Sequence, residues 1–330
     1  MNVSSFFRDK ARSKKRRVVL PEGTELRTIQ AAKKIISDSI ANVTLLGDPN
    51  KIAALAKDYG LNLTKIEVID PPAAANYDTF VSDFIALRKH KGITEQDART
   101  AIANPLYYGA MMVHKDIADA SVAGAVNTTG DVLRAAIQTI GMKPGMLTLS
   151  SSFIMTLPRF REELNKILLF ADCAVVPNPT AEQLVSIASA TADTMQNLLG
   201  MTPKVAFLSF STKGSAAHPD VEKVTKALEL FHKDRPDIQA DGELQLDAAL
   251  IPEIGKRKAP QSEIAGQANI LIFPDLDAGN IGYKMAERLG GATATGPVIQ
   301  GLAKPANDLS RGCSADDIVD TSAIALLLKG

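Results

Sequence analysis

Short runs of β-branched and aliphatic residues alternate with longer segments of helical periodicity along almost the whole chain. This alternation is typical of parallel sheets that are covered by helices on both faces. The expected strands are 17–20, 43–46, 66–69, 120–123, 167–169, 205–208 and 270–273, and the expected helices include 24–38, 78–91, 131–140 and 181–198. Apolar residues recur in these helices at every third or fourth position. The sequence therefore predicts the α/β class.

The length of 330 residues predicts more than one domain, because single hydrophobic cores stop growing at roughly 250–300 residues. The turn-rich segment 141–145 is followed by an extended run, which indicates a domain boundary near 146–152. A second crossing near 295–302 would return the C-terminus to the first domain. We predict an N-terminal α/β domain formed by 1–148 plus 300–330 and a second α/β domain formed by 149–299.

The charge balance and the cysteine count exclude several classes of protein. Lysine plus arginine equals aspartate plus glutamate at 37 each, so the chain lacks the basic field with which nucleic-acid binders attract phosphates. Two cysteines are too few for a disulfide framework, and the first 17 residues lack the apolar run of a signal peptide. No apolar stretch approaches the ~20 residues of a membrane span. We expect a cytoplasmic protein with no nucleic-acid partner and no membrane segment.

Several common catalytic motifs are absent from the sequence. It contains no GxGxxG after a strand, no GxxxxGK[ST], no HExxH and no GxSxG. The four histidines are scattered without the spacing of metal ligands; they are His90, His114, His218 and His232. A metal site built from His and Cys is not expected, although magnesium held by carboxylates stays open.

The segment 280–320 carries the most chemical information. It predicts a helix, a glycine-rich turn, a short strand and the loop LSRGCS, which opens onto a final helix from about Ala315. A loop that leads into a helix presents free backbone N–H groups and the positive end of the helix dipole, which together favour an anion. Arg311 adds a guanidinium that suits phosphate, and Ser310 adds a hydroxyl. The segment predicts a substrate that carries a phosphoryl group.

Asp317 has two possible roles at the start of this last helix. It lies seven residues after Ser310 and could act there as a base. Ser314 and Asp317 also have the spacing of a capping box, in which the acid bonds the N–H of the cap residue. The spacing alone favours the capping role. Arg311 could likewise form a surface ion pair, and Ser310 could simply end a turn.

Two earlier helices carry further cationic candidates. The segment 128–138 follows an expected strand, opens a helix with Thr128 and Thr129, and places Arg134 on that helix. Arg88 lies on the preceding helical segment 78–91. Isolated arginines on helices are more often solvated than bound to a ligand. The loop 211–215, with Lys213, has the small residues that a phosphate-binding turn needs.

These segments resemble the phosphate acetyltransferase and phosphate butyryltransferase family, and the acetyl enzymes most closely. The similarity runs from about Val18 to the C-terminus and is strongest in 122–138, 171–188 and 280–319. The resemblance implies two three-layer α/β domains of isopropylmalate-dehydrogenase-like architecture, with an active-site cleft between them, and a homodimer. It also implies reversible acetyl transfer, in which acetyl-CoA and phosphate give acetyl phosphate and coenzyme A, with no permanently bound cofactor.

The resemblance also implies roles for individual residues. In the family, Ser310 and Arg311 would contact the phosphate and carbonyl groups of the substrate, and Asp317 would be the catalytic acid or base. Arg134 and Arg88 would bind coenzyme A or phosphate, beside Thr128 and Thr129.

The resulting hypothesis for the mechanism is direct transfer. Asp317 accepts the proton of the coenzyme A thiol, and the thiolate attacks the carbonyl of acetyl phosphate. A thiol of pKa ~8.5 is mostly protonated at neutral pH, so a base contributes roughly 10²- to 10⁴-fold. Arg311 and Ser310 stabilise the developing negative charge. Cys313 has no histidine beside it in the sequence and is not expected to act as a nucleophile.

Three alternatives remain at this point. The first is the butyryl version of the same reaction, and the second is a metal-dependent decarboxylating dehydrogenase of shared architecture. The third is a phosphate or nucleotide binder without catalytic activity.

Overall fold

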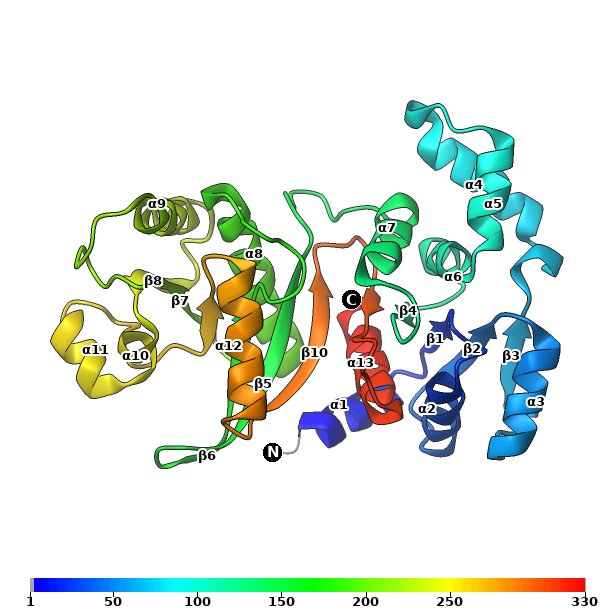
Figure 1. Ribbon diagram of the computed structural model, residues 1–330, viewed down its shortest axis with the longest axis horizontal. Helices are drawn as coiled ribbons and strands as arrows, with labels where there is room; N and C mark the ends of the chain where they lie inside the picture. Colours follow the sequence, from blue (N-terminus) through cyan, green and yellow to red (C-terminus); the bar gives the residue numbers. More distant parts are fainter. Residues whose placement is uncertain (1–2, 330) are drawn as a thin grey trace. The chain divides into compact units, whose positions relative to one another are not determined.

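The computed structural model describes residues 3–329. Contacts within the chain divide it into two compact units (Figure 1). Unit 1 contains the residues up to Pro144 together with those from Leu302 onward, and unit 2 contains Gly145–Gly301. Each unit is built around its own sheet.

The sheet of unit 1 is entirely parallel. Its strands are β1 (Arg17–Leu20), β2 (Asn42–Leu46), β3 (Ile66–Ile69), β4 (Ala120–Ala123) and β11 (Ala306–Asp308). They lie in the order β11-β4-β1-β2-β3. The carboxyl ends of β11, β4 and β1 are therefore neighbours at one edge of the sheet, although these strands are far apart in the sequence.

Unit 1 contains eight α-helices among the described residues. They are α1 (Val3–Arg12), α2 (Leu26–Ser37), α3 (Pro49–Tyr59), α4 (Tyr77–Arg88), α5 (Glu95–Ala103), α6 (Pro105–His114), α7 (Thr129–Thr139) and α13 (Ala315–Leu328). The C-terminal helix α13 contacts α1, α2 and β4, and every residue from Ile318 to Leu326 is buried. Because α13 is apolar on nearly all sides, it belongs inside the unit.

The sheet of unit 2 is mixed. Its strands are β5 (Ser150–Phe160), β6 (Glu163–Ala171), β7 (Lys204–Leu208), β8 (Gln239–Leu244), β9 (Ile270–Ile272) and β10 (Thr293–Gln300), in the order β10-β5-β6-β9-β7-β8. The β10–β5 and β5–β6 pairs are antiparallel, and the others are parallel. The prediction of parallel pairing was thus wrong for one side of this sheet. The β5–β6 hairpin turns at Arg161, which has φ +56°, without the Asn-Gly or Asp-Gly pair that signals such a turn.

Helices cover both faces of this second sheet. They are α8 (Ala181–Thr194), α9 (Pro219–Asp234), α10 (Leu246–Leu250), α11 (Pro252–Lys258) and α12 (Leu276–Arg288). In Figure 1, α12 runs in front of β5 and α8 lies behind it. Gly279 lets α12 approach the chain closely, since a Cβ there would lie 2.2 Å from the carbonyl oxygen of Asp172. The ring of Tyr283 then stacks on Phe153, with centroids 4.1 Å apart.

None of the helices within residues 3–329 combines the length and apolar character that a membrane crossing requires.

Candidate active site

Three loops of unit 1 leave the sheet at the neighbouring carboxyl ends of β1, β4 and β11. We call residues 21–25 the β1–α2 loop, residues 124–128 the β4–α7 loop, and residues 309–314 the β11–α13 loop. In open α/β sheets, ligands bind outside the carboxyl ends of the strands. The last two loops carry Thr128, Ser310 and Arg311, and the helices that they open, α7 and α13, carry the predicted site residues Thr129, Arg134 and Asp317.

Ser310 and Arg311 lie on the β11–α13 loop, and both are exposed. The Ser310 hydroxyl accepts the N–H of Gly312 at 3.3 Å, and its carbonyl accepts the N–H of Cys313 at 2.8 Å. These bonds close a tight turn directly before α13. The Arg311 guanidinium makes no hydrogen bond or ion pair with any residue from 3 to 329. Its donors are therefore accessible to an anion.

Asp317 forms the capping box that its spacing predicted as one alternative. Its Oδ2 accepts the N–H of Ser314 at 2.8 Å and the Ser314 hydroxyl at 2.9 Å, and the Asp317 N–H bonds that hydroxyl at 3.2 Å. Its Oδ1 has no hydrogen-bond partner among the described residues, and the side chain is exposed. A carboxylate offers about four lone-pair sites, so capping through one oxygen leaves the other oxygen free.

Thr128 and Thr129 use their hydroxyls for two different bonds. Thr128 caps α7, because its hydroxyl accepts the Asp131 N–H at 3.2 Å and donates to Asp131 Oδ2 at 2.7 Å. Thr129 donates to Asp308 Oδ2 at 2.6 Å. The second bond ties the start of α7 to the end of β11.

Asp308 is a residue that the sequence analysis missed. It is only 2% exposed, and its Oδ1 is buried without a hydrogen-bond partner in the described part of the chain. Burial raises the pKa of Asp308 to about 6; hydrogen bonding by Thr129 and by the backbone of Leu309 acts against the rise, Glu22 adds to it, and Arg311 opposes it. Its position as the last residue of a strand, just before the LSRGCS loop, is the signal that could have identified it.

Arg134 and Arg88 come from different helices and share one neighbour. Arg134 pairs with Asp131 at 2.8 Å and is otherwise exposed. Arg88 ends α4, and its Nε is buried without a hydrogen-bond partner within residues 3–329. Both charges lower the pKa of Tyr107, although burial is the larger effect and raises it. The two guanidinium groups therefore lie within electrostatic range of Tyr107, which belongs to α6.

Comparison with known proteins identifies the family. A family model described as "Phosphate acetyl/butaryl transferase" matches residues 3–326. The chain belongs to this family. A relative named "Phosphate acetyltransferase" from Thermoanaerobacterium thermosaccharolyticum is 50% identical over 323 residues, which cover 98% of each chain. The resemblance read from the sequence is therefore confirmed.

Solved structures of the phosphate acetyl/butaryl transferase family agree with this fold. A phosphotransacetylase from Streptococcus pyogenes is 41% identical, with a TM-score of 0.93 over 98% of this chain and 97% of that one. The "EutD phosphotransacetylase from Staphylococcus aureus" is 39% identical, with a TM-score of 0.90 over 100% and 98%. A structure named "a putative 4-hydroxythreonine-4-phosphate dehydrogenase from Salmonella typhimurium", at 9% identity and TM-score 0.56, shares the fold alone. The dehydrogenase-like α/β class is confirmed.

Cys313 of this family member is poorly suited to act as a nucleophile. The residue is buried, and burial raises the pKa of its thiol, whereas Arg27 lowers it and Asp317 raises it further. A thiol is reactive as the thiolate, which a raised pKa disfavours. This agrees with the expectation that the acetyl group is not transferred through Cys313.

The loop 211–215 of unit 2 has its donors occupied by acidic side chains. Lys213 bonds Asp241 and the carbonyl of Gly242, the latter at 2.6 Å. The Ser211 hydroxyl and the Gly214 N–H both donate to Glu243 Oε1 at 2.8 Å. An anion such as phosphate would have to displace these carboxylates, so this family member offers no ready phosphate turn here.

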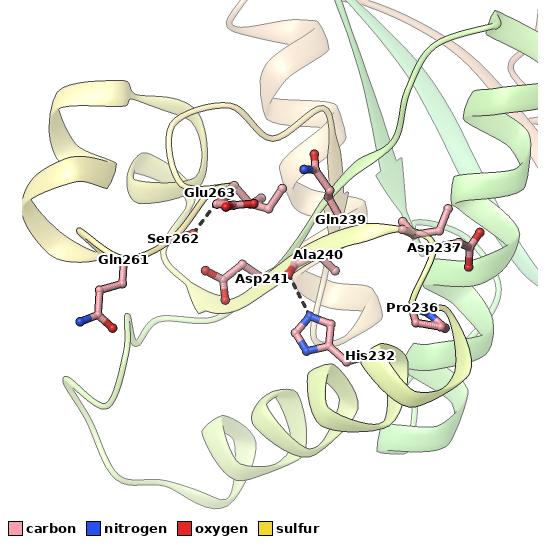
Figure 2. Close-up of a pocket in the computed structure, with 11 residues that line it drawn as sticks. His232, Pro236, Asp237, Gln239, Ala240, Asp241, Gln261, Ser262 and Glu263 are labelled. Atoms are coloured by element: carbon pink, nitrogen blue, oxygen red, sulfur yellow. Dashed lines mark hydrogen bonds between the residues drawn. The ribbon is translucent and has the colours of Figure 1, made fainter.

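A surface pocket of unit 2 has a volume of about 380 Å³. It is lined partly by His232, Asp237, Asp241 and Glu263 (Figure 2). Its three acidic residues disfavour the anionic substrates that the family name implies. A second pocket of about 400 Å³ shares Asp241 with it. Apart from Lys213 of the loop 211–215, which lines the second pocket, none of the site residues predicted from the sequence lines either pocket. Within residues 3–329, no group of three His, Cys, Asp or Glu side chains could hold a metal ion.

Proposed function

We propose that this protein catalyses reversible acetyl transfer between coenzyme A and inorganic phosphate, so that acetyl-CoA and phosphate give acetyl phosphate and coenzyme A. One observation carries the proposal. In a chain 50% identical to a protein named phosphate acetyltransferase, the hydroxyl of Ser310, the unpaired guanidinium of Arg311 and the carboxylate of Asp317, with one free oxygen, lie in the β11–α13 loop and the first turn of α13. These are the three groups that the transfer needs.

Arg311 and Ser310 are the proposed ligands of the phosphoryl and carbonyl oxygens. A guanidinium presents two parallel N–H groups to a phosphate, and Arg311 has no competing partner among residues 3–329. Ser310 already accepts one N–H, which leaves its own hydroxyl proton for the oxygen that becomes negative during attack. The start of α13 adds the positive end of its dipole.

Asp317 is the proposed base for the coenzyme A thiol. Its Oδ2 is held by Ser314, which fixes the direction of the carboxylate. Its Oδ1 is exposed to a ligand and accepts the thiol proton in this proposal. The capping bonds thus orient the base, and the two roles weighed from the sequence do not exclude one another. A well-placed base is worth roughly 10²- to 10⁴-fold in rate.

Coenzyme A is the proposed ligand of the arginines around Tyr107. It acts as a substrate, so the proposal needs no permanently bound cofactor. The Nε of Arg88 is buried and lacks a partner within the described residues, and the other N–H groups of its guanidinium are the proposed donors to a phosphate oxygen. Arg134 would supply a second cation, beside the start of α7 at Thr128 and Thr129.

The proposed assembly is a homodimer. Three large apolar side chains are exposed at intervals of four residues: Ile281 and Met285 on α12, and Leu289 at its C-cap. This spacing places them on one face of the helix, and an exposed apolar stripe of this kind is typical of an interaction surface. A second copy of the chain is the proposed partner.

Both cysteines are free, which supports the proposed cytoplasmic location.

The test measures the formation of acetyl-CoA from acetyl phosphate and coenzyme A. The thioester product is monitored by its ultraviolet absorbance. Asp317→Asn should reduce kcat by roughly 10²- to 10⁴-fold, whereas Cys313→Ala should keep nearly full turnover. Full activity in the Asn variant, or complete loss in the Ala variant, would reverse these assignments.

Two further measurements separate the alternatives. Faster turnover of butyryl phosphate than of acetyl phosphate would favour the butyryl enzyme. Activity that requires a nicotinamide cofactor and stops in excess chelator would favour the dehydrogenase.

A further inference from the structure

We propose that Glu22 and Arg27 are positioning residues, which together hold the β4–α7 loop and the β11–α13 loop in the arrangement that acetyl transfer requires. This inference rests on the proposed function. Neither residue belongs to the groups proposed above to contact substrate, and both come from the segment that follows β1.

Glu22 binds the β4–α7 loop through its backbone. One oxygen of its carboxylate accepts the N–H groups of Gly124 and Ala125 at 3.0 and 2.8 Å. The other accepts those of Val126 and Asn127 at 3.0 and 2.8 Å, together with the Asn127 side-chain amide at 2.8 Å. Four consecutive N–H groups therefore converge on one side chain, which is itself only 7% exposed. This geometry gives the loop one conformation.

Arg27 connects that loop to the β11–α13 loop. Its Nη2 donates to the carbonyl of Ala125 at 2.8 Å. Its Nη1 donates to the carbonyls of Arg311 and Cys313 at 2.7 and 3.0 Å. A planar guanidinium directs these donors at fixed angles, so one side chain sets the distance between the two loops. The Arg311 carbonyl that it binds belongs to a residue proposed to hold the phosphate.

The two loops meet without spare room. Gly124 has φ +119°, and a Cβ at this position would lie 2.5 Å from Asp308 Oδ1 and 2.6 Å from the backbone N of Leu309. A shift of one loop must therefore be transmitted to the other. Misplacement of reacting groups by ~1 Å can reduce a rate by roughly 10²-fold, so the contacts of Arg27 should affect the chemical step.

A purely local role for Arg27 is the competing explanation. Its Nε also donates to Glu25 at 2.6 Å, and Glu25 is the N-cap of α2. If that ion pair were the whole function of Arg27, its loss would affect only the start of α2. Glu25→Gln removes the charge of the pair and leaves the donors to both loops in place, so it separates the two explanations.

The experiment compares Arg27→Ala and Arg27→Lys with two controls, Glu25→Gln and Arg12→Ala. Arg12 is a matched arginine of unit 1 that binds a backbone carbonyl and Asp9 outside the candidate site. We expect kcat to fall by roughly 10- to 100-fold in both Arg27 variants, with each KM changed by less than about threefold because the proposed substrate ligands remain. Millimolar guanidinium should restore part of the kcat of Arg27→Ala. Both controls should keep kcat within about twofold of the parent.

Amide hydrogen exchange provides a readout that does not depend on activity. In Arg27→Ala, the amides of 124–127 and 310–313 should exchange faster together, while those of α3 remain unchanged. Glu22→Gln, which places donors against the N–H groups, should have the same effect on 124–127.

Each result bears on one of the two claims. A parent protein that forms no acetyl-CoA refutes the proposed function, and the exchange data then decide whether Arg27 couples the loops. An active parent with unchanged kcat in both Arg27 variants overturns this inference. Equal losses in Arg27→Ala and Glu25→Gln, without rescue by guanidinium, would also overturn it and assign Arg27 to the cap of α2.

Discussion

Replacing Asp308 with Asn should remove a pH-dependent loss of folding stability. The side chain is 2% exposed, and its Oδ1 has no hydrogen-bond partner within residues 3–329. Ionising this buried carboxyl is unfavourable, because its negative charge would lie away from water and be only partly compensated by hydrogen bonds. Burial accordingly raises the pKa of Asp308 from 3.8 to about 6.

The magnitude follows from the linkage between proton binding and folding. A rise from 3.8 to about 6, at 1.36 kcal/mol per pKa unit, corresponds to about 3 kcal/mol. Between these two values the folded state binds the proton more tightly than the unfolded state does, so the free energy of unfolding falls as the pH rises. The contribution is complete below pH 3.8 and is lost as the pH passes about 6.

The assay is urea unfolding of the parent and of Asp308→Asn at a series of pH values from 4.5 to 8. The difference in unfolding free energy between the two proteins should change by about 2 kcal/mol across this series, mostly between pH 4.5 and the pKa of about 6, and should level off above it. Any constant offset, caused by the amide that replaces the carboxyl, does not enter this comparison. Thr129→Val supplies a second test. It removes a hydroxyl that lowers the pKa of Asp308, so the pH at which the profile levels off should rise.

Parallel pH profiles for the parent and Asp308→Asn would refute this reasoning. They would mean that water reaches the carboxyl in solution, or that the carboxyl has a further hydrogen-bond or ionic partner besides Thr129. A difference that grows in the opposite direction, with the parent gaining stability as the pH rises, would indicate a lowered pKa and a compensating cation.

Four other changes have definite expected outcomes. Arg311→Lys should raise the KM for acetyl phosphate roughly tenfold or more in steady-state assays, because an ammonium group cannot form the paired bonds of the guanidinium. Arg88→Ala should raise the KM for coenzyme A more than the KM for acetyl phosphate. Gly279→Ala should lower the free energy of unfolding by roughly 1–3 kcal/mol in urea, because its Cβ would lie 2.2 Å from a carbonyl oxygen. Met285→Glu should weaken self-association in sedimentation, whereas a substitution at an exposed position of α3 should not.

The local parts of the fold could be predicted from the sequence because they depend on neighbouring residues. The bounds expected for the strands at 17–20, 66–69 and 120–123 are those of β1, β3 and β4. The alternation of short apolar runs and helical periods identified the α/β class, which the solved relatives confirm. The S-x-x-D spacing likewise predicted the capping box of α13 as one alternative. The residues proposed for catalysis were recognised from the same short segment, and their roles stay predictions, as does the division into folding domains.

Strand partners and the positioning of the loops were decided by the tertiary structure. The pairing of β5 with β6 and with β10 is antiparallel, and the apolar runs of these strands carry no information on direction. Glu22 is bonded to residues 102–105 positions away, and Arg27 to residues as far as 286 positions away. Such contacts exist only because the sheet order β11-β4-β1 brings three strand ends together. A local pattern can specify which side chains are present at a strand end, but the raised pKa of Asp308 and the joining of the two loops arise from the packing of segments that are distant in the sequence.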